Sequence, residues 1–188
     1  MTAVESAAAL LAKFGNAITN QIEFRGETTV VTTKSAAHGL LTHCRDALGY
    51  DLLLDISSVD HMGTDPRFEM VYELYSLAGK SHLRVKFPLS EDAADATTVS
   101  DLWPTADWHE REVYDMMGIH FTGHPDLRRI LMWDGYPHFP LRKEFPLAGK
   151  STEVPDVAFT NPAPLAGGPF VSSVGAQDTI HREPRSRE

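Results

Sequence analysis

The sequence predicts an α+β fold: a small mixed or antiparallel sheet with helices on one face, followed by a long irregular C-terminal extension. Helical and strand-like hydrophobic periods alternate over the first 120 residues. Nine of the 12 prolines lie between Pro125 and Pro184, and proline disrupts both helices and central strands. We therefore expect an α+β domain over residues 1–120, an irregular partner-binding segment over 121–150, and an extended Pro/Gly-rich tail over 151–188.

The N-terminal part predicts a short helix that ends at Gly15, a β-hairpin that turns at Gly26, and a second helix that ends at Gly49. Ser35 is placed to cap the second helix. The buried stripe of that helix would be Leu40, Leu41, Cys44 and Leu48. Cys44 is thus expected to be a buried core residue.

Three further strands are predicted. Residues 52–59 are mostly apolar, which favours the centre of the sheet. Apolar and polar residues alternate over 68–77 and 82–87, and these two strands should form a hairpin around Ala78 and Gly79. If Leu77 faces Lys80, the apolar positions of both strands meet on one face. The expected pairs are Leu74 with Leu83, Tyr72 with Val85, Met70 with Phe87, and Glu73 with Arg84.

Composition narrows the class of protein. The chain is 42% hydrophobic and 23% charged, with a net charge of -9, which is typical of a globular protein and unfavourable for binding nucleic acid. No apolar run approaches the ~20 residues of a membrane-spanning helix, and the N-terminus lacks the pattern of a signal peptide, so we expect residence in the cytoplasm. With Cys44 as the single cysteine, no disulfide, multi-cysteine zinc site or whole iron–sulfur cluster is expected in this chain.

Residues 108–117 predict a helix that Gly118 ends in a left-handed conformation. Asp107 could accept amide hydrogens of the first turn while Glu110 reaches back to form a capping box. The charged set is typical of a solvated helix face, on which Arg111 and Asp115 could pair one turn apart. Its members are Glu110, Arg111, Glu112 and Asp115.

The segment that follows has four cations in loops that are rich in proline and apolar residues. They are Arg128, Arg129, Arg142 and Lys143. Guanidinium groups present several donors in a fixed plane. We expect these four cations to donate hydrogen bonds to backbone carbonyls of a neighbouring chain.

Two other classes of protein are compatible with parts of the sequence. His109, His120, His124 and His138, with Glu110 and Glu112 nearby, could be a hydrolytic metal site. Glycine and proline interrupt the chain between them, so they cannot share one helix face as in zinc metalloproteases, and no metal ligand is predicted. A generic adaptor that binds peptides by a sheet edge or by its tail is the other alternative.

Two blocks of residues resemble the signature of the thirty-kilodalton subunit family of respiratory complex I, known in bacteria as the C subunit of NADH-quinone oxidoreductase. The first block is Glu110-Arg111-Glu112, Asp115, Met116-Met117, His124, Arg128 and Ile130-Leu131. The second is Pro140-Leu141-Arg142-Lys143. The similarity is strict over residues 103–150 and loose from about residue 24.

The resemblance implies a non-catalytic structural subunit in the hydrophilic arm of a proton-translocating NADH:quinone oxidoreductase. It implies no cofactor in this chain, with FMN and iron–sulfur clusters in partner subunits. The expected partners are the quinone-cavity subunit and the terminal iron–sulfur subunit. This chain is expected to be peripheral to the cell inner (plasma) membrane, on its cytoplasmic side, with membrane contact made indirectly through the complex. The equivalent subunit of a ferredoxin-linked dehydrogenase or a membrane-bound hydrogenase remains an alternative.

Overall fold

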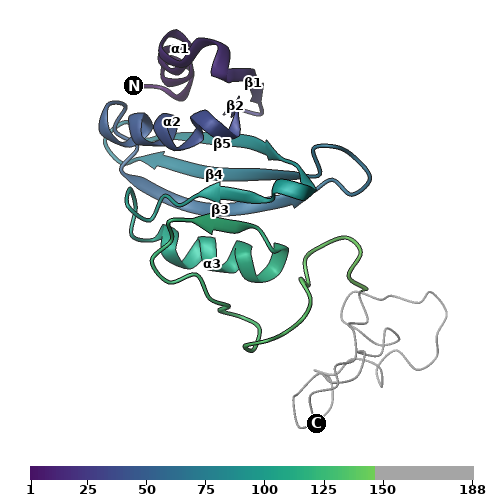
Figure 1. Ribbon diagram of the computed structural model, residues 1–188. Helices are drawn as coiled ribbons and strands as arrows, with labels where there is room; N and C mark the ends of the chain where they lie inside the picture. The colour runs from purple at the N-terminus through teal and green to yellow at the C-terminus, as the bar shows by residue number, and fades with distance from the viewer. Residues whose placement is uncertain (147–188) are drawn as a thin grey trace, which may run out of the picture. The chain divides into compact units, whose positions relative to one another are not determined.

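The computed structural model describes residues 1–146, and Met1–Arg142 form one compact unit. Residues 147–150 and the predicted tail, 151–188, lie outside the described residues. The helices are α1 (Ala3–Phe14), α2 (Lys34–Asp46) and α3 (Ala106–Met117), with 3₁₀ turns at Gly15–Ala17 and Glu91–Ala93. The strands are β1 (Ile18–Phe24), β2 (Glu27–Thr32), β3 (Leu52–Asp60), β4 (Phe68–Ser76), β5 (Ser81–Leu89), β6 (Asp95–Thr97) and β7 (His120–Thr122) (Figure 1).

The main sheet has five strands in the order β1-β2-β5-β4-β3. All its pairs are antiparallel except β2 with β5, which run parallel because α2 and the β3–β4 hairpin lie between them in the sequence. The predicted mixed α+β class is confirmed. The prediction that residues 52–59 form a central strand is wrong: β3 is an edge strand, and β5 is central.

The apolar character of β3 has a different cause. Helix α3 lies beside β3 in Figure 1, and Leu53 and Ile56 of this strand are buried in the core. An edge strand that is partly covered by a helix needs apolar side chains as much as a central strand does.

The β4–β5 hairpin has the predicted register. Leu74 lies opposite Leu83, Tyr72 opposite Val85, Met70 opposite Phe87, and Glu73 opposite Arg84. The tight turn is accommodated by a positive φ of 47° at Lys80, not at Ala78. Alternation of apolar and charged residues thus specified this pairing, because a one-residue slip would have placed charges in the core.

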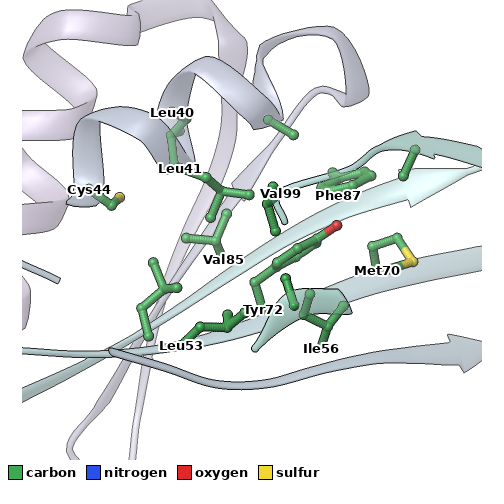
Figure 2. Packing of buried hydrophobic residues seen from close by; sticks show 14 of the residues in the cluster. Leu40, Leu41, Cys44, Leu53, Ile56, Met70, Tyr72, Val85, Phe87 and Val99 are labelled. Atoms are coloured by element: carbon green, nitrogen blue, oxygen red, sulfur yellow. The ribbon is translucent and has the colours of Figure 1, made fainter. Parts of the chain in front are cut away.

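One face of the sheet packs on the core. Figure 2 shows α2 side chains, including Leu40 and Leu41, above the β4 and β5 residues Tyr72 and Val85. Apolar residues of α1 and α3 join the same cluster. Cys44 is completely buried within it, as predicted, and burial raises the pKa of its thiol to about 12.

The other face of β4 and β5 carries ion pairs. Glu73 pairs with Arg84, and Lys86 donates to Glu69 at 2.8 Å. Arg84 also reaches Glu27 of β2 at 2.9 Å. Opposite charges directly across neighbouring strands reinforce the register that the apolar face sets.

The predicted cap of α2 is wrong, and α1 has a cap that was not predicted. Helix α1 begins with a capping box, in which the Thr2 side chain accepts from the Glu5 amide and Glu5 accepts from the Thr2 amide. Helix α2 begins after Thr33, so Ser35 lies inside its first turn and does not cap it. After β7, residues 123–146 contain no helix or strand, as the proline content of this segment predicts.

Candidate functional site: helix α3 and the loop bound to it

Helix α3 and residues 123–142 carry most of the residues that the sequence singled out. The helix ends at Gly118, which has a φ of 73° as predicted. A Cβ at Gly118 would lie 2.7 Å from Arg142 Nη2 and from the Phe139 ring. Glycine is therefore required at this position both by the backbone conformation and by the close approach of the loop.

The start of α3 contradicts the predicted capping box. The N-cap is Thr105, without a side-chain hydrogen bond, and Asp107 lies within the first turn. Glu110 does not reach back along the helix. Its Oε1 accepts from the Val99 amide at 2.7 Å, and its Oε2 accepts from the Thr98 hydroxyl at 2.6 Å. A tertiary contact has replaced the local one.

Glu110 is also not part of a solvated face, because its side chain is 0% exposed. Burial raises the pKa of Glu110 to about 7, although the bonds from Thr98 and Val99 act in the opposite direction. Arg111 and Asp115 are buried too, and among these four charged residues Glu112 is the exposed one.

Asp115 ties the loop to the helix. Its Oδ2 accepts from three successive amides, those of Ile130, Leu131 and Met132, at 3.0, 2.7 and 2.8 Å. Its Oδ1 accepts from Arg129 at 2.5 Å. Burial alone would raise the pKa of Asp115, but these donors outweigh it and lower the pKa. The three successive amides of the loop thus bind the carboxylate as the amides of a helix N-terminus bind an anion.

The predicted pair of Arg111 with Asp115 does not form. Arg111 donates instead to the Arg128 and Arg129 carbonyls at 3.2 and 3.3 Å, and its guanidinium lies 5.2 Å from the Trp108 ring centre. The partner of Asp115 is Arg129, fourteen residues further along the chain.

Arg129 and Arg142 complete the attachment. Arg129 donates to the carbonyls of Asp115, Tyr136 and His138 at 3.0, 2.6 and 3.3 Å. Arg142 donates to the Met117 carbonyl at 2.7 Å and lies 4.6 Å from the Phe139 ring centre. For Arg129 and Arg142 the bonded carbonyls therefore belong to this chain, which differs from the expectation of a neighbouring one.

The first part of the loop is fixed by His124, whose side chain is 0% exposed. Its Nδ1 accepts from the Asp126 amide at 3.0 Å, so Nε2 carries the proton and donates to the Asp107 carbonyl at 3.2 Å. His109 pairs with Asp55 of β3 instead. Within residues 1–146, no three His, Cys, Asp or Glu side chains are grouped so that they could hold a metal ion.

Several side chains of this region point to solvent. Trp108, Leu131 and Leu141 are each about 60% exposed. Arg128 is exposed and pairs with Asp126 at 2.9 Å, and Lys143 is exposed as well. We call Trp108, Leu131 and Leu141 the exposed apolar set. They are presented by α3 and by a loop that Arg111, Asp115 and Arg142 bond to that helix.

Sequence reasoning missed two buried groups near this region. Arg67 donates to both carboxylate oxygens of Asp60 at 2.9 Å, and Asp60 is almost completely buried. Asp60 and Arg67 lie at the two ends of the β3–β4 connection. The opposite charges at these two ends could have indicated the pair from the sequence. Thr98 was missed because a lone threonine in a loop carries no such signal.

Comparisons with known proteins identify the family of the chain. A family model described as the 30-kDa subunit of respiratory-chain NADH dehydrogenase matches residues 30–151. The C subunit of NADH-quinone oxidoreductase from Geotalea uraniireducens (strain Rf4) is 47% identical over 141 residues, 75% of this chain and 86% of that protein. The second C subunit of the same enzyme from Rhizobium meliloti (strain 1021) is 42% identical over 161 residues, 83% and 86% of the two chains.

Two solved structures share the fold. A trypsin-resistant fragment of Nqo5 is 33% identical with a TM-score of 0.60, and the match covers 68% of this chain and all of that fragment. A chain of the membrane-bound sulfane sulfur reductase, an archaeal respiratory membrane complex, is 25% identical with a TM-score of 0.66, covering 77% of this chain and 85% of that one. This chain belongs to the family of 30-kDa subunits of respiratory-chain NADH dehydrogenase.

Proposed function

We propose that this chain is a non-catalytic structural subunit of the hydrophilic arm of a proton-translocating NADH:quinone oxidoreductase. Family membership makes it a component of that enzyme, with other subunits of the enzyme as its partners. The finer proposal is that it braces the quinone-cavity subunit and the terminal iron–sulfur subunit. FMN and the iron–sulfur clusters would lie in partner subunits, and this chain would hold none.

The observation that carries the proposal is the exposed apolar set on α3 and on the loop that is bonded to it from within. Loops without regular structure ordinarily place polar side chains toward water. Here Asp115 and three arginines bond the loop to α3, and Trp108, Leu131 and Leu141 remain in solvent. A pre-ordered segment with large exposed apolar side chains suits a protein interface, because little conformational entropy is lost when a partner binds.

The signature residues divide into two roles under this proposal. Asp115, Arg129 and Arg142 hold the loop from inside, while Glu112 and Arg128 join the exposed apolar set at the interface. Glu110 bonds residues 98–99 instead, and Lys143 stays a predicted interface residue of the following unit. Rim charges of this kind affect association rate and specificity more than they affect affinity.

The proposed place of the chain is peripheral, on the cytoplasmic side of the inner membrane. None of the helices in residues 1–146 combines the length and apolar character needed to cross a membrane. Membrane contact would be made through partner subunits of the complex.

The test is recovery of partners with a tagged full-length chain in cells that lack the untagged copy. Leu131→Asp should reduce the yield of co-purifying oxidoreductase subunits, measured by quantitative mass spectrometry, by at least about tenfold, since one charge in an apolar contact costs more than about 1.4 kcal/mol. Leu77→Asp is the matched control: Leu77 is 60% exposed but lies in the β4–β5 turn. Equal recovery with both variants would contradict the proposed interface.

A second candidate function has a specific observation in its favour. The archaeal chain that shares the fold is part of a membrane-bound sulfane sulfur reductase. The equivalent subunit of a ferredoxin-linked dehydrogenase or membrane-bound hydrogenase would have the same fold and the same kind of interface. The identity of the co-purifying subunits separates the two, because an NADH-oxidising flavoprotein would be recovered only in the first case.

A further inference from the structure

Three acidic side chains within residues 1–146 are at most 1% exposed: Asp60, Glu110 and Asp115. Asp60 faces Arg67, and Asp115 faces Arg129. Glu110 has no lysine or arginine within ion-pair distance among the described residues, and the nearest basic group is His124, with Nε2 3.8 Å from Glu110 Oε2. A buried carboxylate without a cation is costly unless it takes up a proton.

His124 is in a poor position to supply the missing positive charge. Its Nδ1 already accepts from the Asp126 amide, and its Nε2 donates to the Asp107 carbonyl. A doubly protonated ring would turn an N–H toward the N–H of Asp126 and lose that bond. These two bonds occupy both ring nitrogens of His124, so neither nitrogen lies within hydrogen-bond distance of Glu110.

The hydrogen bonds of Glu110 can serve both charge states. Thr98 Oγ1 lies 2.6 Å from Glu110 Oε2 and 2.9 Å from Ser100 Oγ. When Glu110 is ionised, Thr98 donates to it and Ser100 can donate to Thr98. When Glu110 is protonated, it can donate to Thr98, and Thr98 can donate to Ser100. When the Thr98 and Ser100 hydroxyl groups exchange donor and acceptor roles in this way, the Val99 amide still donates to Glu110 Oε1.

The remaining groups around Glu110 disfavour its charge. Asp107 belongs to α3 and Asp101 to the segment before it, and both are acids that raise the pKa of Glu110. Asp101 is itself paired with His38 of α2. From β4, Tyr72 is 0% exposed, and its hydroxyl has no hydrogen-bond partner within the described residues. Burial raises the pKa of Tyr72, and the charge of Glu110 raises it further.

We infer that Glu110, Thr98 and His124 form a proton-operated latch: one proton held on Glu110 keeps α3 closed against residues 98–100, and loss of that proton weakens the closure. The inference goes beyond the proposed function and does not depend on which subunits bind. If α3 separates from residues 98–100, the pKa of Glu110 returns to that of an ordinary glutamate. Loss of the proton and opening of the contact therefore favour each other.

The first test is a direct titration of the full chain. The carboxyl carbon of Glu110, followed by NMR in the uniformly ¹³C,¹⁵N-labelled chain and assigned by through-bond correlation to its own backbone, should titrate with a midpoint of about 7. Asp101→Asn should lower that midpoint, and Thr98→Val, which removes a donor to the carboxylate, should raise it. A wild-type midpoint below about 5, within the range of ordinary glutamates, would overturn the inference.

The second test follows stability with pH. The pKa of Glu110 is raised from 4.5 to about 7, so the folded chain holds more protons between these values and loses stability as pH rises across them. That difference of about 2.5 pH units corresponds to a fall of about 300-fold in the folding constant from well below pH 4.5 to well above pH 7.

A matched pair of variants isolates this contribution in urea unfolding. Glu110→Gln should remove the component of the pH dependence centred between these values, whereas Glu112→Gln, an exposed position two residues away on the same helix, should retain it. An unchanged pH profile in Glu110→Gln would refute the latch. If Glu110→Gln does not fold, the wild-type titration and its shift in Asp101→Asn decide the matter, since neither requires the loss of the carboxyl.

Discussion

Asp115 is the group whose removal should damage the α3 site most. Asp115→Ala deletes a carboxylate that is 0% exposed and bonded to Arg129 and to the amides of Ile130, Leu131 and Met132. The substitution leaves three amides and one guanidinium edge without this acceptor. Little else in the loop would replace it, because residues 123–146 contain no helix or strand of their own.

The size of the effect follows from these contacts. A hydrogen bond to a charged group contributes about 1.5–3 kcal/mol, but the four bonds share one acceptor and do not add. Breaking a buried ion pair by removing one partner costs about 3–5 kcal/mol. We expect Asp115→Ala to lower the free energy of unfolding by about 3–5 kcal/mol, a large part of the ~5–15 kcal/mol of a typical domain.

Urea unfolding of the full chain at pH 7, followed by circular dichroism, measures this difference. Asp126→Ala is the control, because Asp126 also pairs with an arginine of the loop but is exposed, and should cost less than about 1 kcal/mol. The lowered pKa of Asp115 means that its contribution is present above its unfolded pKa of about 3.9 and is lost as pH falls further. Equal effects of the two variants would refute the assignment of Asp115 as the anchor.

Two further predictions concern Gly118 and Cys44. Gly118→Ala should lower the stability of the chain more than Gly26→Ala does. Both positions have a positive φ, which costs about 1–2 kcal/mol for alanine. A Cβ at Gly118 would also meet Arg142 and Phe139 at 2.7 Å, whereas nothing lies within 4 Å of a Cβ at Gly26. Equal decreases in the thermal unfolding temperature of the two variants would contradict this, because they would show that Arg142 and Phe139 move away from the new Cβ at no cost. Cys44, whose pKa burial raises to about 12, should resist iodoacetamide at about pH 8 in the folded chain and react in urea, and rapid labelling without urea would contradict its place in the core.

The sequence predicted best where neighbouring residues decide the outcome. The β4–β5 register followed from alternation, because apolar Tyr72 and Val85 must share a face. The end of α3 at Gly118 followed from a conformation that glycine adopts readily. The edge position of β3 could not be predicted in this way, because strand order depends on contacts between segments far apart in the chain.

The same limit explains the errors in α3. Asp115 could have paired with Arg111 one turn away, but Arg129 offers that carboxylate a guanidinium from a loop that also brings three amides to it. Glu110 could have capped the helix, but Thr98 and the Val99 amide bind it inside the core. Local patterns indicated that these residues were charged and close in sequence, but their partners lie in segments whose approach only the fold determines.

The central claim is that this chain holds subunits together through α3 and its loop and performs none of the chemistry. The most direct measurement is quinone reductase activity per assembled enzyme, normalised to flavin, in membranes of cells with wild-type chain or with Leu131→Asp. The account predicts less assembled enzyme with Leu131→Asp and nearly unchanged turnover per flavin. Normal assembly with lost turnover would contradict it and would place the chain in the reaction itself.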